Sequence, residues 1–246
     1  EFKVVPNMSW LNEERVDDDY YLTPKDDHTS TLVWLHGLGD SALGFIDVFR
    51  SSKISPCSKT TKVILLTAPV RAVTVNFGMQ MPCWFDYRSF DSSDPENFID
   101  PEQLEESKAR IIAVIEKEVK DCLDGDYSKL MIGGFSQGAA LSLYVATQLE
   151  QNIRGVIFCS GHPLYQNPAE EISESKKTLP IFAYHGSDDP LLPLKLSFEP
   201  IRDLKDAGFD VTAEVEEDLG HSMSKDEWIK IAKFVSDLEG GSHSTA

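Results

Sequence analysis

The chain has 246 residues, of which 41% are hydrophobic and 26% charged, a composition typical of one globular domain with a sizeable core. Its formal net charge of −18 argues against nucleic acid and against docking on anionic lipid through a basic patch, because phosphate groups repel such a surface. No apolar run reaches the length of a membrane span and no signal peptide pattern is visible, so integral membrane association is not expected.

The first 28 residues are irregular and acidic, and we expect a peripheral extension in which an edge strand near 20–22 is the one candidate element. The domain proper is predicted over 29–239 and a flexible tail over 240–246. Apolar runs predict buried strands over 31–35 and 63–66, with a helix over 41–52 between them.

The segment 71–90 has no clean period but is rich in large apolar side chains, including Phe77, Met81 and Trp84. A connection of this length without regular structure is usually functional or disordered, and this one is too apolar for disorder. Composition leaves two interpretations open. The segment is either a loop packed over the core or the wall of an apolar pocket.

The second half of the chain alternates clearly between strands and helices. Asp100 and Pro101 predict the cap and first turn of an amphipathic helix, and Ser224 with Glu227 predicts a capping box for the closing helix. Further strands are expected over 130–132, 155–159, 180–184 and 211–215, with a helix after 194 that stops at Gly208. This order predicts a single α/β domain with a mostly parallel central sheet and helices on both faces.

The four cysteines show no C-x-x-C pattern, so no zinc site is indicated, while their even number leaves disulfides open. Cys159 ends an apolar strand and Cys122 lies on the apolar side of a helix. Both are expected to be buried thiols, which favours a reducing, cytoplasmic compartment.

The most informative motif is G-x-S-x-G at 134–138, which stands between a predicted strand and a predicted helix. In that context it predicts a nucleophile elbow with Ser136 at its tip. Gly134 and Gly138 are needed because side chains there would collide with the neighbouring strand and helix. The helix behind Ser136 points its N-terminal N–H groups at the place where negative charge would develop.

A serine nucleophile needs a base and an orienting acid, and in α/β-hydrolases these follow in the chain order Ser, Asp or Glu, His. Only His221 lies in a loop after the last predicted strand, so it is the predicted base. The acid belongs to the preceding loop, where Asp188 and Asp189 both qualify, with a slight preference for Asp189. Two backbone N–H donors are expected, one from Gln137 and one from the glycine-rich loop at 36–40.

Several motifs in order then resemble one family. HGLGD at 36–40, APVR at 68–71, MPCWFD at 81–86, GGFSQGAALSLY at 133–144, HGSDDPLLP at 185–193 and GH at 220–221 are similar to the acyl-protein thioesterase/lysophospholipase family, the phospholipase–carboxylesterase group of α/β-hydrolases. The resemblance runs over 29–238.

This resemblance implies an α/β-hydrolase fold and a serine hydrolase with Ser136, Asp189 and His221 as catalytic residues. It places the oxyanion donors at the backbone of Leu38 and Gln137. It also implies an acyl channel lined by five further residues, namely Phe77, Met81, Trp84, Leu191 and Leu192.

The resemblance further implies cleavage of long-chain acyl thioesters on protein cysteines, in the cytoplasm, by a monomer or weak homodimer without metal or cofactor. The alternative is a carboxylesterase or lysophospholipase that acts on small esters. A catalytically silent interaction protein on the same fold is a third hypothesis, but it usually shows a broken triad.

Three features depart from the family pattern. Ala139 stands where the family usually has a second glycine after Gly138. The run Cys159-Ser160-Gly161-His162 stands where the family more often has small polar residues followed by a tryptophan. The N-terminal extension is longer than in the usual minimal enzyme.

Overall fold

The computed structural model describes residues 10–51, 55–89 and 98–240. The first nine residues, Ser52 of the helix predicted over 41–52, Phe90 of the 71–90 connection and the tail after 240 lie outside these ranges. The strands are β1 (Leu11–Val16), β2 (Asp19–Pro24), β3 (Ser30–Leu35), β4 (Thr61–Leu66), β5 (Val70–Val73), β6 (Met79–Pro82), β7 (Leu130–Phe135), β8 (Gly155–Cys159), β9 (Ile181–Gly186) and β10 (Val211–Glu216). The α-helices are α1 (Ala42–Arg50), α2 (Pro101–Cys122), α3 (Gln137–Gln148), α4 (Pro168–Glu171), α5 (Leu194–Ser197), α6 (Glu199–Asp206) and α7 (Lys225–Gly240).

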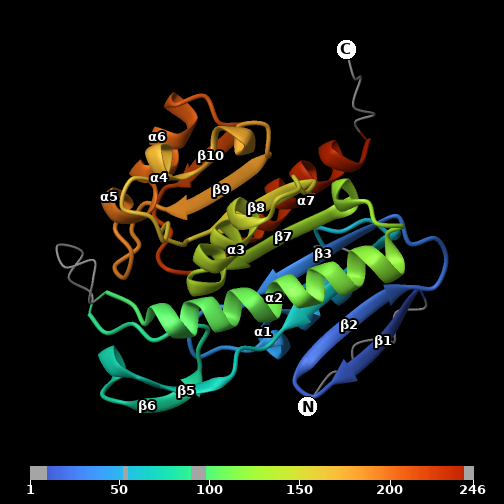
Figure 1. The fold of residues 1–246 in the computed structure, drawn as a ribbon, viewed down its shortest axis with the longest axis horizontal. Helices are drawn as coiled ribbons and strands as arrows, with labels where there is room; N and C mark the ends of the chain where they lie inside the picture. Colours follow the sequence, from blue (N-terminus) through green and yellow to red (C-terminus); the bar gives the residue numbers. More distant parts are fainter. Residues whose placement is uncertain (1–9, 52–54, 90–97, 241–246) are drawn as a thin grey trace.

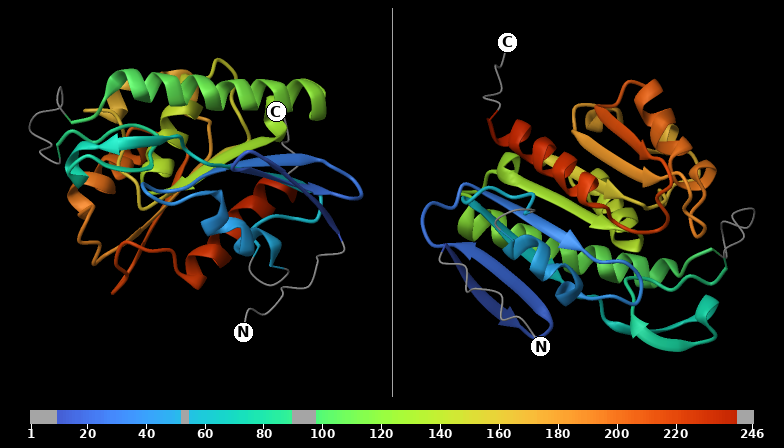
Figure 2. Two further views of the ribbon diagram at one scale, coloured as in Figure 1. Left: turned by 90° about the horizontal axis from the view of Figure 1, so that it is seen from below. Right: turned by 180° about the vertical axis from the view of Figure 1, so that it is seen from behind.

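Eight strands form one sheet in the order β1-β2-β4-β3-β7-β8-β9-β10. The six strands from β4 to β10 in this order run parallel, whereas β1 and β2 pair antiparallel at one edge. Helices α2 and α3 lie on one face in Figure 1, and α1 and α7 lie on the other, as the view from behind in Figure 2 shows. The predicted α/β fold with a mostly parallel, doubly covered sheet is confirmed.

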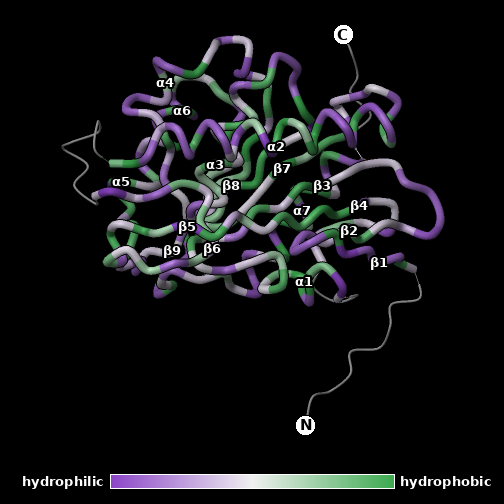
Figure 3. The backbone as a smooth tube through the Cα atoms, turned by 60° about the horizontal axis from the view of Figure 1, so that its bottom comes forward, coloured by the Kyte–Doolittle hydropathy of each residue, from purple (hydrophilic) through white to green (hydrophobic). Residues whose placement is uncertain are grey.

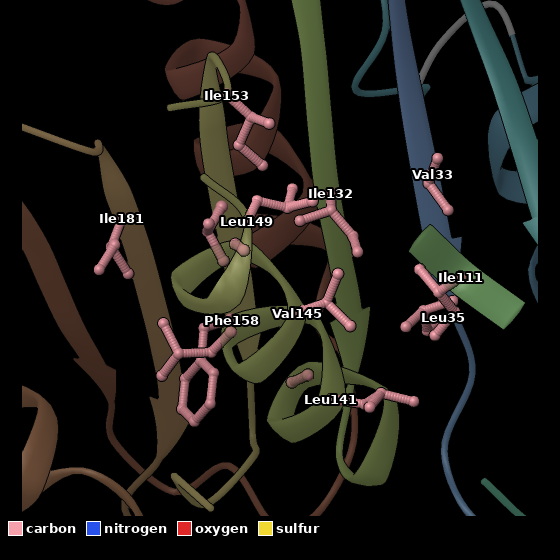
Figure 4. Close-up of a cluster of buried hydrophobic side chains, with 14 of the residues drawn as sticks. Val33, Leu35, Ile111, Ile132, Leu141, Val145, Leu149, Ile153, Phe158 and Ile181 are labelled. Carbon is pink, nitrogen blue, oxygen red and sulfur yellow. The ribbon is translucent and has the colours of Figure 1, made fainter. Parts of the chain in front are cut away.

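The central strands are buried on both faces, as crossover connections require. In β3, Val33 and Leu35 pack with α2 and α3, whereas Leu32 and Trp34 pack with α1 and α7. Figure 4 shows part of the first core, where Leu141 and Val145 of α3 face the sheet. Hydrophobic stretches accordingly concentrate along the central strands in Figure 3, and hydrophilic ones along the outer loops.

The N-terminal extension takes part in this sheet. The edge strand expected near 20–22 is the middle of β2, but β2 is not at the edge of the sheet. A second strand that the sequence pattern did not indicate, β1, pairs along its outer side. Leu22 is fully buried, and the Asp19 carboxylate binds Arg110 of α2 through both oxygens at 2.9 and 2.8 Å. The described part of the extension is thus joined to the domain by main-chain pairing and by an ion pair.

Two other expectations need correction. The connection after residue 70 contains regular structure, because β5 and β6 pair as a two-stranded antiparallel ribbon. Cys159 is buried as expected, but Cys122 is exposed, since it is the last residue of α2 and lies beside Lys62 with the Sγ to Nζ distance at 3.9 Å. Within the described ranges, no helix combines the length and the apolar character needed to cross a bilayer.

Candidate active site

Ser136 lies between β7 and α3, at the sharp turn that the motif predicts. Its backbone has φ 56° and ψ −120°, a conformation that costs a non-glycine residue free energy and is concentrated at functional sites. The Ser136 N–H donates to Cys159 O at 2.8 Å, which fixes the turn against the end of β8. A Cβ on Gly134 or Gly138 would lie 2.5 or 2.2 Å from Leu35 O, so both glycines are required by contact with β3.

His221 bridges Ser136 and Asp189. Its Nε2 lies 2.9 Å from Ser136 Oγ and its Nδ1 lies 2.6 Å from Asp189 Oδ2. An ionised carboxylate only accepts hydrogen bonds, so the proton belongs on Nδ1 and Nε2 is left to accept from the serine hydroxyl. The His221 ring also packs on Phe135, with ring centroids 4.9 Å apart.

The structure distinguishes Asp188 from Asp189, the two candidates for the orienting acid between which the sequence gave only a slight preference. Asp189 is 6% exposed, whereas Asp188 is exposed to solvent and its Oδ1 accepts from the Ser187 hydroxyl at 2.9 Å. Asp189 Oδ1 accepts from the backbone N–H groups of Leu191 and Leu192, both at 2.9 Å. The buried negative charge is therefore held by donors on both oxygens, as burial of a carboxylate requires.

Main-chain contacts hold the acid loop against the base loop. Ser187 N–H donates to Glu216 O at 2.8 Å and Asp188 N–H donates to Leu219 O at 2.9 Å. A Cβ on Gly186 would lie 2.2 Å from Leu219 O, so only glycine permits this approach. The ends of β9 and β10 therefore present Asp189 and His221 to each other.

His185 was not singled out by the sequence, yet it touches the same carboxylate. Its Nε2 lies 3.3 Å from Asp189 Oδ2 and donates to Leu192 O at 2.8 Å. Burial lowers the pKa of His185, so the ring is neutral near pH 7, and its Nε2 proton is used in the hydrogen bond to Leu192 O. Among the described residues, no group of three or more His, Cys, Asp or Glu side chains is arranged to hold a metal ion.

Two backbone N–H groups beside Ser136 are available to a ligand. In the described part of the chain, neither Leu38 nor Gln137 uses its N–H in a hydrogen bond. Gly37 lies directly against the serine, because a Cβ there would be 3.2 Å from Ser136 Cβ. The predicted donors thus lie on the two segments next to the serine.

His36 and Trp84 support the loop that carries Leu38. The buried His36 donates from Nδ1 to Gly37 O at 2.6 Å and accepts at Nε2 from Ala68 N–H at 2.9 Å, and burial lowers its pKa. The Trp84 indole N–H donates to His36 O at 2.9 Å. Trp84 is fully buried, so it reaches the site through His36 and presents no open surface.

The Gln137 side chain is a second feature that the sequence did not reveal. It is buried, its Oε1 accepts from Trp84 N–H at 2.8 Å, and its Nε2 donates to Phe85 O at 2.7 Å. One amide therefore fastens the 83–85 segment to the first turn of α3. The sequence shows only that a polar residue stands in the first turn of an apolar helix. It does not show what this residue binds, because Trp84 and Phe85 lie far away in sequence.

The structure contains an open groove of about 720 Å³, and only two of the five predicted channel residues line it. Leu191 and Leu192 line it, together with apolar side chains such as Phe98 and Leu164. Phe77 is 97% exposed in the turn between β5 and β6, and Met81 is half-buried on β6. Neither of these residues, nor Trp84, belongs to the groove wall, and Ser136 does not line it either.

The chain matches known proteins over most of its length. The phospholipase/carboxylesterase family model matches residues 20–239. The chain is 36% identical to acyl-protein thioesterase 1 homolog 1 of Dictyostelium discoideum, over 85% of this chain and 90% of that protein. It is 32% identical to acyl-protein thioesterase 1 of Schizosaccharomyces pombe, over 89% of this chain and 95% of that one.

The solved structure of Zea mays acyl-protein thioesterase 2 superposes with a TM-score of 0.72 at 25% identity, covering 89% of this chain and 98% of that one. The fold is therefore that of the α/β-hydrolases. The chain belongs to the phospholipase/carboxylesterase family of hydrolases.

Proposed function

We propose that this protein is a serine hydrolase that removes long-chain acyl groups from protein cysteines through an acyl-enzyme. The observation that carries the proposal is the hydrogen-bonded chain from Ser136 Oγ through His221 to Asp189, beside two unused backbone N–H groups. The curated relatives that match most of the chain are acyl-protein thioesterases, which supports the thioester as substrate.

In the proposed mechanism, Ser136 Oγ attacks the thioester carbonyl carbon while His221 Nε2 takes the hydroxyl proton. Asp189 stabilises the imidazolium that forms, and the N–H groups of Leu38 and Gln137 bind the oxyanion. The C–S bond breaks as His221 returns the proton to the leaving thiolate. Water activated by His221 then attacks the acyl-Ser136 ester and releases the fatty acid.

The groove lined by Leu191 and Leu192 is the proposed site for the acyl chain. The backbone N–H groups of these two residues bind Asp189, and the groove volume of about 720 Å³ suits a long alkyl group. Phe77 and Met81 lie outside this groove and stay predicted substrate residues, whereas the fully buried Trp84 would act on a substrate only through its contact with His36. The four free cysteines fit a protein of the reducing cytoplasm, where we propose that it works as a monomer or weak homodimer.

A carboxylesterase or lysophospholipase activity is the second candidate, because the family description names phospholipases and carboxylesterases. Apolar walls bind either acyl group, and each added methylene discriminates weakly. A silent interaction protein is disfavoured by the intact chain of hydrogen bonds from Ser136 to Asp189.

A substrate panel separates the candidates. We expect kcat/KM to be highest for a palmitoyl-cysteine peptide, lower for lysophosphatidylcholine and for a short-chain p-nitrophenyl ester, and undetectable for all three with Ser136→Ala. Preference for the short ester by orders of magnitude would refute the thioesterase assignment. Equal hydrolysis by Ser136→Ala would refute the serine mechanism itself.

A further inference from the structure

Leu191 and Leu192 belong both to the groove and to the support of the proposed catalytic acid. Their side chains line the groove, while their backbone N–H groups donate to Asp189 Oδ1, both at 2.9 Å. The other carboxylate oxygen, Oδ2, lies 2.6 Å from His221 Nδ1. Ser136 does not line the groove, so these two leucines join the groove wall to the hydrogen-bonded chain that ends at the serine.

Buried polar groups hold the backbone on the other side of Leu192. Leu192 O accepts from His185 Nε2 at 2.8 Å and from the Ser197 hydroxyl at 3.2 Å, and neither of these side chains is more than 1% exposed. The Ser197 hydroxyl also reaches Pro193 O at 3.0 Å. The carbonyl side of the segment is thus fixed to β9 and α5. A change in the packing of the Leu192 side chain is therefore passed to its N–H side, where Asp189 is bound.

The two leucine side chains are only loosely packed when the groove is open. Leu191 is 68% exposed, and Leu192 is partly exposed. An alkyl chain in the groove would cover both side chains, and this burial is favourable only while the leucines lie against the chain. An occupied groove would therefore restrict the segment that holds Asp189.

We propose that Leu191 and Leu192 are positioning residues that couple the acyl chain of the substrate to the orientation of Asp189, so that a longer chain raises kcat and not only affinity. A chain that reaches the two leucines holds their N–H groups on Oδ1, which keeps Oδ2 aligned with His221. A contact remote from the reacting carbonyl is then used in the transition state. This inference rests on the serine hydrolase function proposed above.

The test is a series of p-nitrophenyl esters from butyrate to decanoate, with kcat and KM measured for each. His221 transfers a proton in both acylation and deacylation, so the effect should appear in kcat whichever step limits the rate. For wild type we expect kcat to rise about tenfold across the series. In Leu191→Ala and Leu192→Ala it should rise less than about twofold, relative to each variant's own value with butyrate. Neither side chain is part of the buried core, and thermal melting checks that each variant is folded.

Two other leucines provide matched controls. Leu164 also lines the groove, but the backbone donors to Asp189 Oδ1 are those of Leu191 and Leu192. Leu164→Ala should therefore raise KM for the longer esters and keep the rise in kcat. Leu43 is 61% exposed on α1 and does not line the groove, so Leu43→Ala should match wild type at every chain length.

A double-mutant cycle tests whether the coupling passes through Asp189. In Asp189→Asn, the residual kcat should no longer rise with chain length, and adding Leu192→Ala should change it less than about twofold. A rise with chain length that persists in Asp189→Asn would show that the acyl chain acts by another route, and would overturn the proposal.

Fluorophosphonate labelling separates failure of this inference from failure of the serine mechanism. An enzyme labelled at Ser136, whose kcat rises equally in wild type and Leu192→Ala, would overturn the coupling alone. A constant wild-type kcat with only KM falling along the series would overturn it too, and so would a loss of the rise in Leu164→Ala as large as in Leu192→Ala. Absence of labelling would refute the serine mechanism, and this inference with it.

Discussion

Asp189 holds His221 with one carboxylate oxygen and its own loop with the other. Its Oδ2 lies 2.6 Å from His221 Nδ1, while its Oδ1 accepts two backbone N–H groups at 2.9 Å. Because the loop donors fix the carboxylate, the remaining oxygen can only face the imidazole. This arrangement sets both the orientation of His221 and the position of its proton.

Asp189→Asn should therefore lower kcat by about 10³- to 10⁴-fold with little change in KM. The Asn oxygen would stay on the N–H groups of Leu191 and Leu192, which turns the amide NH₂ toward His221 Nδ1. The ring would then carry its proton on Nε2 and could not accept one from Ser136. Steady-state kinetics with Asp188→Asn as the matched control tests this. Equal losses in the two variants, or a larger loss at Asp188, would refute the assignment.

Gln137→Ala should destabilise the fold by about 2–4 kcal/mol, because it leaves Trp84 N–H and Phe85 O buried without a partner. The control is Gln148→Ala on the exposed side of the same helix, which should change the free energy of unfolding by less than about 0.5 kcal/mol. Urea denaturation measures both. A Gln137 variant as stable as the Gln148 variant would show that the buried amide does not fasten the 83–85 segment.

Gly138→Ala should abolish activity and lower stability severely, because its Cβ would lie 2.2 Å from Leu35 O and 2.5 Å from His36 O. Both obstructing atoms are backbone, so neither can move as a side-chain tip could. Gly240→Ala is the control, since a Cβ there meets nothing within 4 Å. Soluble yield and thermal melting report the difference, and a Gly138→Ala enzyme of normal stability would contradict the geometry of the turn.

Glu227, a fully buried carboxyl in the first turn of α7, should make stability depend on pH. The folded protein holds the Glu227 proton up to about pH 7, against an ordinary value of 4.5, so the unfolded state loses it first as the pH rises. The stabilisation from this group is complete below about pH 4.5 and is lost between there and about pH 7, a change on the order of 3 kcal/mol. Relative to wild type, Glu227→Gln should thus gain stability from about pH 5 to about pH 8 in urea titrations. A difference that stays constant with pH would contradict the burial of this carboxyl as an ionisable group.

The sequence predicted those features that depend only on residues close together in the chain. The elbow at Ser136, the cap at Asp100 and the capping box at Ser224 follow from neighbouring residues, and the structure contains all three. The alternation of strands and helices likewise predicted the sheet, because each pattern reflects the burial of its own element.

What the sequence missed depends on contacts between distant segments. Nothing near Gln137 indicates that its amide binds Trp84 and Phe85, and nothing near His185 indicates that its ring faces Asp189. The choice between Asp188 and Asp189 also required the fold, since it depends on which carboxylate points inward. The strand β1 has an exposed, charged sequence that pairs with β2 through its backbone, so side-chain periodicity gave no sign of it.

The most direct test of the account is covalent labelling of Ser136. Wild-type protein treated with a fluorophosphonate should gain one adduct by intact-mass spectrometry, and peptide mapping should place it on Ser136. Ser142→Ala is the matched control, because it removes a buried hydroxyl from the same helix that only donates to Gly138 O at 2.7 Å. We predict full labelling of wild type and Ser142→Ala and none of Ser136→Ala, whereas labelling of Ser136→Ala at the wild-type rate would contradict the central claim that Ser136 is the nucleophile.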